Sequence, residues 1–193
     1  MLDAALQLEP SDSLQPHTYT TLIGLLAVTG LRISEALALQ FSDLTPQGLV
    51  IHKTKFQKTR LVPLHETTAA ALNRYLIRRR EHYGGERVFI TKDGCPLRYR
   101  DVYPTFQKLA KAAEVLGSRG RRPRWHELRH TFAVRALEAS PKGRQQVGQH
   151  LLALATYMGH VNIDATYWYL EATPELLRDI ARAAETFIRG GQL

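Results

Sequence analysis

The spacing of apolar residues along the chain predicts a mainly helical protein. In several segments apolar side chains recur every three or four positions, which places them on one face of a helix. The helices predicted in this way span 17–30, 34–40, 66–82, 101–115, 126–139, 144–158, 162–170 and 174–189. Residues 1–17 contain two prolines and a Ser/Asp cluster, so we expect a linker or a frayed N-terminus there, followed by one domain over 18–193.

Three short segments interrupt the helical pattern and predict a small sheet. Residues 48–52 and 60–64 are rich in β-branched and apolar side chains, and the polar stretch 53–59 separates them, as in a β-hairpin. Residues 88–90 supply a third short strand ahead of an Asp-Gly turn. The expected fold class is therefore mainly α with a small three-stranded antiparallel sheet (α+β).

Composition narrows the class of protein and points to an anionic partner. A chain of 193 residues that is 44% hydrophobic can bury a real core, while its single cysteine, Cys95, excludes a disulfide framework and a thiolate zinc site. It contains neither a signal peptide nor the run of about 20 apolar residues that spans a bilayer, so we expect a cytoplasmic protein. The net charge is +8, carried by 19 Arg and 7 Lys. Because guanidinium groups bind phosphate bidentately, this balance favours a polyanion as partner.

The segment His126 to His130 reads HELRH and admits two interpretations. It matches the H-E-x-x-H signature of zinc peptidases, in which two histidines of one helical face bind the metal. No third ligand follows at the spacing that the extended signature requires. Alternatively, His126 and Arg129 are two cationic donors on one helical face that point at a common anion.

Four motifs in order resemble those of the tyrosine recombinase (phage integrase) family. They are TGLRISE at 29–35, Lys55 with KTRLVPL at 58–64, HELRHTFA at 126–133, and MGH at 158–160 with Tyr169 nine residues later. The resemblance covers about residues 18–173. It implies the catalytic-domain fold of that family, and DNA recombination, integration or transposition through a 3′-phosphotyrosyl intermediate formed without a cofactor or a metal.

The resemblance also implies a role for each matched side chain on the scissile phosphate. Arg32 and Arg129 are the paired arginines on the phosphate, His160 is a third donor, and His126 binds phosphate and transfers a proton. Attack on a phosphodiester builds negative charge on the non-bridging oxygens, and two guanidinium forks are able to stabilise it.

The two remaining catalytic positions are a lysine and a tyrosine. The resemblance makes Lys55 the acid that protonates the departing 5′ oxygen, although the residues alone leave Lys53 and Lys58 of the same hairpin open as the acid or as phosphate contacts. Tyr169 is the expected nucleophile because of its distance from His160. Tyr167 is the alternative, since it lies only two residues away.

Supporting and DNA-contacting residues complete the expectation. Glu35 is expected to orient Arg32, and His130 to be a structural neighbour of His126; His150, which belongs to no motif, is expected on the surface. Phosphate contacts along duplex DNA are expected from the basic hairpin and from the RGRRPR segment, at Lys53, Lys58, Arg119, Arg121, Arg122 and Arg124.

Assembly and location follow from the same resemblance. The C-terminal helix over 174–193 is expected to dock on a neighbouring protomer or on its own domain, and a DNA-binding protein of this kind is expected at the nucleoid. The family's N-terminal clamping domain does not fit in this length, so weak, salt-sensitive DNA binding is expected. A type IB topoisomerase-like activity is the alternative with the same chemistry, and the zinc peptidase is the less favoured one.

Overall fold

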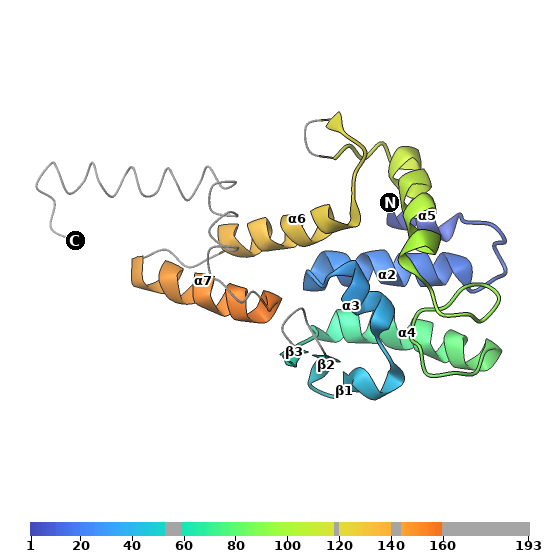
Figure 1. Ribbon diagram of the computed structural model, residues 1–193, viewed down its shortest axis with the longest axis horizontal. Coiled ribbons are helices and arrows are strands. Elements are labelled where there is room, and N and C mark those ends of the chain that lie inside the picture. The colour runs from blue at the N-terminus through green and yellow to red at the C-terminus, as the bar shows by residue number, and fades with distance from the viewer. Residues whose placement is uncertain (53–58, 118–119, 140–143, 160–193) are drawn as a thin grey trace, which may run out of the picture. The chain divides into compact units, whose positions relative to one another are not determined.

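The structure is a computed structural model that describes residues 1–52, 59–117, 120–139 and 144–159 (Figure 1). The predicted helices 162–170 and 174–189 lie outside the described residues. The chain divides into two compact units, Met1–Arg129 and His130–Leu193, and each is described by itself. Within the described residues, no helix is long and apolar enough to cross a membrane.

The first unit is built around one buried helix. Helix α2 (Gln15–Thr29) carries apolar side chains on most of its surface, and Leu22, Ile23, Leu25 and Leu26 are each at most 3% exposed. It contacts α1 (Leu2–Leu6) and lies beside α4 (Glu66–His82), as Figure 1 shows. Helices α3 (Ile33–Ala38) and α5 (Tyr99–Ala112) belong to the same unit, as does a short 3-10 helix, η1 (Phe41–Asp43).

The N-terminal segment differs from the linker expected over residues 1–17. Residues Leu2–Leu6 form helix α1, and the side chains of Ala5, Leu8 and Leu14 are 0%, 5% and 6% exposed. The apolar residues of Leu2–Leu6 cover little more than one helical turn and are followed by a stretch rich in Pro, Ser and Asp, so they were too few to reveal a helical period. The buried side chains are nevertheless enough to hold the segment against α2, because burial and not local propensity stabilises so short a helix.

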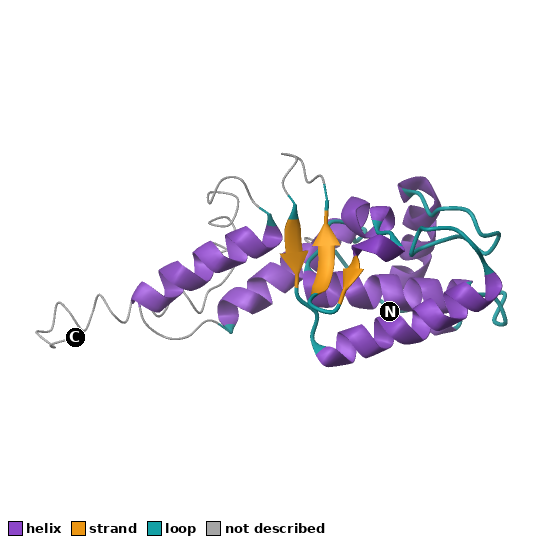
Figure 2. Ribbon diagram, turned by 90° about the horizontal axis from the view of Figure 1, so that it is seen from below, coloured by secondary structure: helices purple, strands orange, loops and turns teal. Residues whose placement is uncertain are grey.

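The sheet is three-stranded and antiparallel as expected, but one of its strands is not the predicted one. Strands β1 (Leu44–Thr45), β2 (Gly48–Ile51) and β3 (Arg60–Val62) are ordered β1-β2-β3, with Leu49 opposite Val62 and Ile51 opposite Arg60 (Figure 2). Gly48 enters β2 at φ 138°, where a Cβ would lie 2.3 Å from the carbonyl oxygen of Val62. A glycine is therefore required at this turn into the sheet.

The predicted strand at 88–90 is wrong. Val88, Phe89 and Ile90 are at most 2% exposed, but the segment forms only isolated bridges, between Gln40 and Arg87 and between Ile90 and Pro96. A short apolar run bounded by turns is also the pattern of a buried loop that crosses the core. The sequence does not distinguish the two, because the difference depends on which backbone lies alongside.

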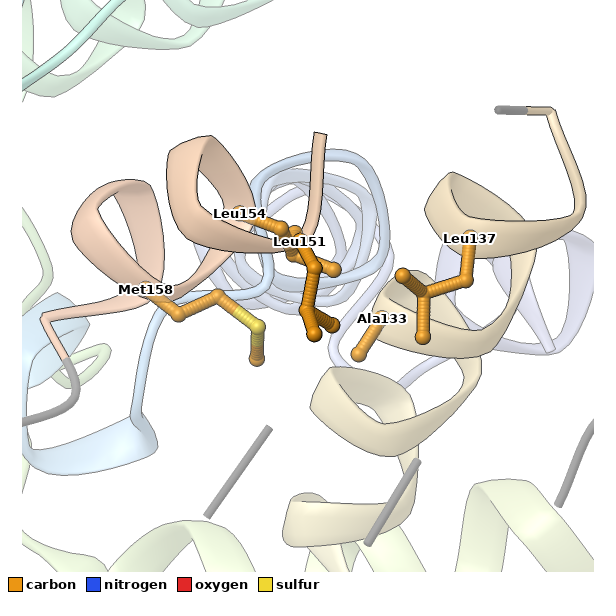
Figure 3. Close-up of a cluster of buried hydrophobic side chains, with 5 residues drawn as sticks. All are labelled: Ala133, Leu137, Leu151, Leu154 and Met158. Carbon is orange, nitrogen blue, oxygen red and sulfur yellow. The ribbon is translucent and has the colours of Figure 1, made fainter. Parts of the chain in front are cut away.

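The second unit is described through parts of two helices. Helix α6 (Trp125–Glu138) begins in the first unit, and its part after Arg129 belongs to the second, together with α7 (Arg144–Met158). Figure 3 shows that their side chains meet in a cluster made of Ala133, Leu137, Leu151, Leu154 and Met158. His150, expected on the surface, is half-buried instead, with its Nε2 atom 2.8 Å from the carbonyl oxygen of Ala136.

Candidate functional site

Three of the predicted catalytic residues, Arg32, His126 and Arg129, line one cavity in the first unit. The cavity has a volume of about 380 Å³, and it lies where the α2–α3 junction, the start of α5 and the start of α6 converge. Arg32 and Arg129 are 97 positions apart in the sequence. The full lining is Leu31, Arg32, Ile33, Ser34, Tyr99, Arg124, Trp125, His126 and Arg129.

The α2–α3 junction explains the TGLR motif. Gly30 ends α2 in the left-handed conformation, at φ 60°, with its N–H bonded to the carbonyl oxygen of Leu26 at 3.0 Å. The Thr29 hydroxyl donates to the carbonyl oxygen of Leu25 at 2.6 Å. Leu31 is 2% exposed and anchors the turn, so that Arg32 stands at the N-cap of α3 and faces the cavity. A left-handed C-cap of this kind favours glycine, because it has no Cβ to clash.

Glu35 binds Arg32 twice, as expected for a residue that orients it. Its Oε1 atom lies 2.9 Å from Nη1 of Arg32, and its Oε2 atom accepts the Arg32 backbone N–H at 2.9 Å. The second bond also closes the first turn of α3. Both contacts come from residues three positions apart, so this part of the site is fixed locally.

Arg60 also binds Glu35, a role that was not expected from the sequence. From strand β3, its Nη1 and Nη2 atoms donate to Oε1 and Oε2 of Glu35 at 3.0 and 2.8 Å, a bidentate pair. The signal in the sequence was present, because Arg60 belongs to the KTRLVPL motif and is a charged residue in an otherwise apolar strand. Only the tertiary structure shows that its side chain reaches Glu35 on α3.

The electrostatics of Glu35 reflect these partners. Burial is the largest single influence and raises the pKa of the carboxyl, but the hydrogen bonds from Arg60 and Arg32 and the positive charge of Arg60 together outweigh it. The net result is a pKa below the ordinary value of 4.5. Glu35 is therefore an anion at neutral pH, held between two cations.

Arg129 is held deep in the wall of the cavity. Its residue exposure is only 2%, and its Nη1 atom donates to the carbonyl oxygen of Gly30 at 2.6 Å. The glycine that ends α2 thus also accepts a hydrogen bond from the second arginine. A buried guanidinium held in this way is oriented before any ligand arrives, which lowers the entropic cost of binding an anion.

The start of α6 places Arg124 and His126 at the rim. Trp125 is 3% exposed and stacks on Phe106 of α5 with ring centroids 4.1 Å apart, which fixes the first turn. The Arg124 backbone N–H donates to Oε2 of Glu127 at 3.2 Å. Arg124 and His126, on either side of the buried tryptophan, are both exposed and both line the cavity.

The remaining predicted site residues divide into described and undescribed ones. Arg121 and Arg122 are exposed in the segment before α6, and His130 is half-buried on α6. Tyr99, which no expectation included, lines the cavity from the start of α5, where nothing in the sequence distinguishes it. Several predicted positions lie outside the described residues, namely Lys53, Lys55, Lys58, Arg119, His160, Tyr167 and Tyr169.

The described lining of the cavity is suited to an anion. Among the described residues that line the cavity, three are arginines, one is a histidine and none is a carboxylate. In the described part of the chain, no group of three His, Cys, Asp or Glu side chains is placed to hold a metal ion. Guanidinium groups and an imidazole converging on one cavity are suited to a tetrahedral oxyanion.

The family model described as "Phage integrase family" matches residues 4–175. A putative integrase/recombinase, y4rB of Sinorhizobium fredii, is 38% identical over 179 residues, covering 89% of this chain and 57% of that protein. Tyrosine recombinase XerD of Mycobacterium tuberculosis is 32% identical over 178 residues, covering 89% of this chain and 53% of that one. The chain thus spans somewhat more than half the length of these relatives. The zinc-peptidase interpretation gains no support from them.

Solved structures share the fold. XerA recombinase superposes with a TM-score of 0.71 at 20% identity, covering all of this chain and 62% of that one. The catalytic domain of bacteriophage HP1 integrase gives a TM-score of 0.62 at 23% identity, covering 94% of this chain and 87% of that domain. These matches confirm the expected fold class. With the family model matching most of its length, the chain belongs to the phage integrase family.

Proposed function

We propose that this chain is the catalytic part of a site-specific DNA recombinase that cuts and rejoins strands by transesterification. The observation that carries the proposal is the convergence of Arg32, His126 and Arg129 on one cavity, whose described lining residues include no carboxylate. A phosphodiester in that cavity receives two guanidinium groups from separate elements. The names of the relatives, an integrase/recombinase and tyrosine recombinases, support the same reaction class.

The two arginines differ in what they contribute. Arg129 is nearly fully buried and fixed on Gly30, so its position changes little when a phosphate binds. The Arg32 side chain is 32% exposed and held on one side by Glu35, so its remaining N–H groups are oriented toward the cavity. Pre-oriented cations stabilise the charge that develops on non-bridging oxygens without reorganising during the reaction.

The chemical steps are assigned to motif residues, most of them outside the described part of the chain. The Tyr169 phenol attacks phosphorus, the bond from phosphorus to the 5′ oxygen breaks, and a 3′-phosphotyrosyl link forms. His126 takes part in proton transfer, Lys55 protonates the departing 5′ oxygen, and His160 is a further donor to the phosphate. A second 5′-hydroxyl reverses these steps on another strand, so the exchange needs no external energy source.

Duplex DNA is the proposed partner. The exposed Arg121, Arg122 and Arg124 lie directly ahead of the cavity-lining turn of α6, where they extend the positive charge beyond the scissile phosphate. Two solved structures with this fold are XerH recombinase bound to its difH substrate and a Tn1549 transposon integrase bound to transposon DNA. Association with the nucleoid, and self-association on DNA through residues 174–193, belong to the same proposal.

Covalent trapping tests the proposal directly. The chain is incubated in EDTA with a pool of randomised duplexes, each nicked near its centre so that a cleaved strand is lost and the intermediate accumulates. We expect a denaturant-resistant protein–DNA adduct that is absent in Tyr169→Phe and present in Tyr167→Phe. An adduct abolished by EDTA, or none at all, contradicts the proposal.

Product analysis separates recombination from the alternative. Recovered duplexes are built into two-site plasmids, and supercoiled single-site plasmids serve as the comparison. Exchange of flanking DNA between two sites is expected. Relaxation of the supercoiled plasmid with no exchange identifies a type IB topoisomerase-like enzyme instead.

A further inference from the structure

A single carboxylate joins two arginines beside the cavity, and only one of them lines it. Glu35 accepts two bonds from Arg60, at 3.0 and 2.8 Å, and two from Arg32, one through Nη1 and one through the backbone N–H, both at 2.9 Å. An ionised carboxylate offers about four lone-pair sites. All four are therefore filled, and Glu35 has no acceptor capacity left for a second bond from the Arg32 fork.

The burial of the three side chains places Arg60 behind Glu35. The Arg60 and Glu35 side chains are 10% and 7% exposed, whereas the Arg32 side chain is 32% exposed. Within the described part of the chain, the lining of the cavity includes Arg32 and does not include Arg60. A phosphate in the cavity thus meets Arg32 directly and Arg60 only through Glu35.

The pairing geometry decides how much of Arg32 a phosphate is able to use. An arginine beside a carboxylate favours two parallel bonds, fork to fork. Here that bidentate position is taken by Arg60, and the Arg32 side chain keeps a single bond through Nη1. The three charged groups together carry a net charge of +1. Without Arg60 the remaining pair of Arg32 and Glu35 carries no net charge. Glu35 is then able to bind the Arg32 guanidinium bidentately and so to occupy N–H groups that would otherwise bind the phosphate.

We propose that Arg60 is a positioning residue of the site, which occupies Glu35 bidentately and thereby keeps the Arg32 guanidinium oriented toward the bound phosphate. The inference rests on the proposed function for its substrate, but its geometry involves only described residues. It also gives the KTRLVPL motif a second role. Arg60 lies opposite Ile51 in the sheet, so the pairing of β3 with β2 fixes where its fork reaches α3.

A double-mutant cycle on the full chain tests this role with inorganic phosphate as the probe. Phosphate is titrated into the wild type, Arg60→Met, Glu35→Gln and the double variant, and binding is followed through the arginine side-chain N–H signals in NMR. Loss of one charge-assisted contact weakens binding by about tenfold or more, so we expect that loss in Arg60→Met. In the Glu35→Gln background the same change is expected to cost less than about threefold, because no anion remains to capture Arg32.

Two further variants separate positioning from folding. Arg60→Lys keeps the charge but loses the fork, so we expect phosphate binding between those of the wild type and Arg60→Met. Arg74→Met removes an exposed arginine of α4 that does not line this cavity, and is expected to bind phosphate like the wild type. Circular dichroism and thermal melting of every variant show whether each is folded.

The outcomes distinguish this proposal from the proposed function. The role of Arg60 is overturned if Arg60→Met lowers phosphate affinity equally in both backgrounds, or if it leaves phosphate affinity unchanged. It is also overturned if the wild type binds no phosphate. The adduct assay is run on the same variants. If the coupling is present and no adduct forms, the role of Arg60 stands and DNA cleavage is refuted; if an adduct forms and the coupling is absent, the reverse holds.

Discussion

Two glycines of helix α2 are expected to respond to alanine with opposite signs. Gly24 lies inside the helix, and a Cβ built there meets nothing within 4 Å. Gly30 ends the helix at φ 60° and is buried. The two glycines are six positions apart, one inside α2 and one at its C-terminal end. Comparing their alanine variants therefore tests the effect of backbone conformation within one helix.

The magnitudes follow from the two conformations. Gly24→Ala gains helix propensity without a clash and is expected to raise the free energy of unfolding by about 0.5–1 kcal/mol. Gly30→Ala forces a side chain into the left-handed region, which costs about 1–2 kcal/mol. It also strains the carbonyl that holds Nη1 of Arg129 at 2.6 Å. The two variants should therefore differ by about 1.5–3 kcal/mol.

Thermal and urea unfolding followed by circular dichroism measure this difference. For a chain of this size about 1 kcal/mol corresponds to 2–4 °C in Tm, so the two melting temperatures should move apart by several degrees. In the adduct assay Gly30→Ala is expected to cut more slowly than Gly24→Ala, because only the former disturbs Arg129. If both variants shift Tm in the same direction, or if Gly30→Ala is neutral, the left-handed cap is not what Gly30 provides.

Three further predictions concern packing and titration. Arg79 is 1% exposed and donates to the carbonyl oxygens of Gly84 and Arg87 at 2.9 and 3.0 Å. Arg79→Met should therefore lower the unfolding free energy by about 2–4 kcal/mol. The exposed neighbour Arg80 stacks on the ring of Phe41, and Arg80→Met should lower the unfolding free energy by less than about 1 kcal/mol. Equal urea midpoints for the two variants would contradict this. Burial raises the pKa of Tyr75 to about 12 from its ordinary 10.0. Because the pKa of Tyr75 is higher in the folded than in the unfolded state, the phenol contributes roughly 2–3 kcal/mol to the free energy of unfolding below pH 10, and this contribution is lost as the pH rises toward 12. Tyr75→Phe should therefore flatten the alkaline decline in stability measured by urea titrations. Leu154→Ala in the α6–α7 cluster should cost about 2–5 kcal/mol and Leu152→Ala, 58% exposed, under about 0.5 kcal/mol, as hydrogen exchange in α7 would report.

The helices show which elements the spacing of apolar residues predicts correctly. The ranges 66–82 and 144–158 coincide with α4 and α7, because each carries an apolar stripe between recognisable ends. Helix α1 was missed, since five residues carry too short a period, and the strand at 88–90 was misassigned, since its apolar side chains would suit a strand equally well. In both cases neighbouring elements, and not local preference, decided the conformation.

By itself, the sequence determined the family and the mainly helical class with its small sheet, and it predicted which cationic residues belong to the site, because motif order and side-chain chemistry are local properties. The contact between Glu35 and Arg32 could also be predicted from the sequence, because the two residues are about one helical turn apart. Tertiary structure alone decided that Arg129 donates a hydrogen bond to the carbonyl oxygen of Gly30, 99 positions away, and that Arg60 binds Glu35 from strand β3. Such pairs depend on how separate elements pack and on strand register, which no spacing along the chain encodes.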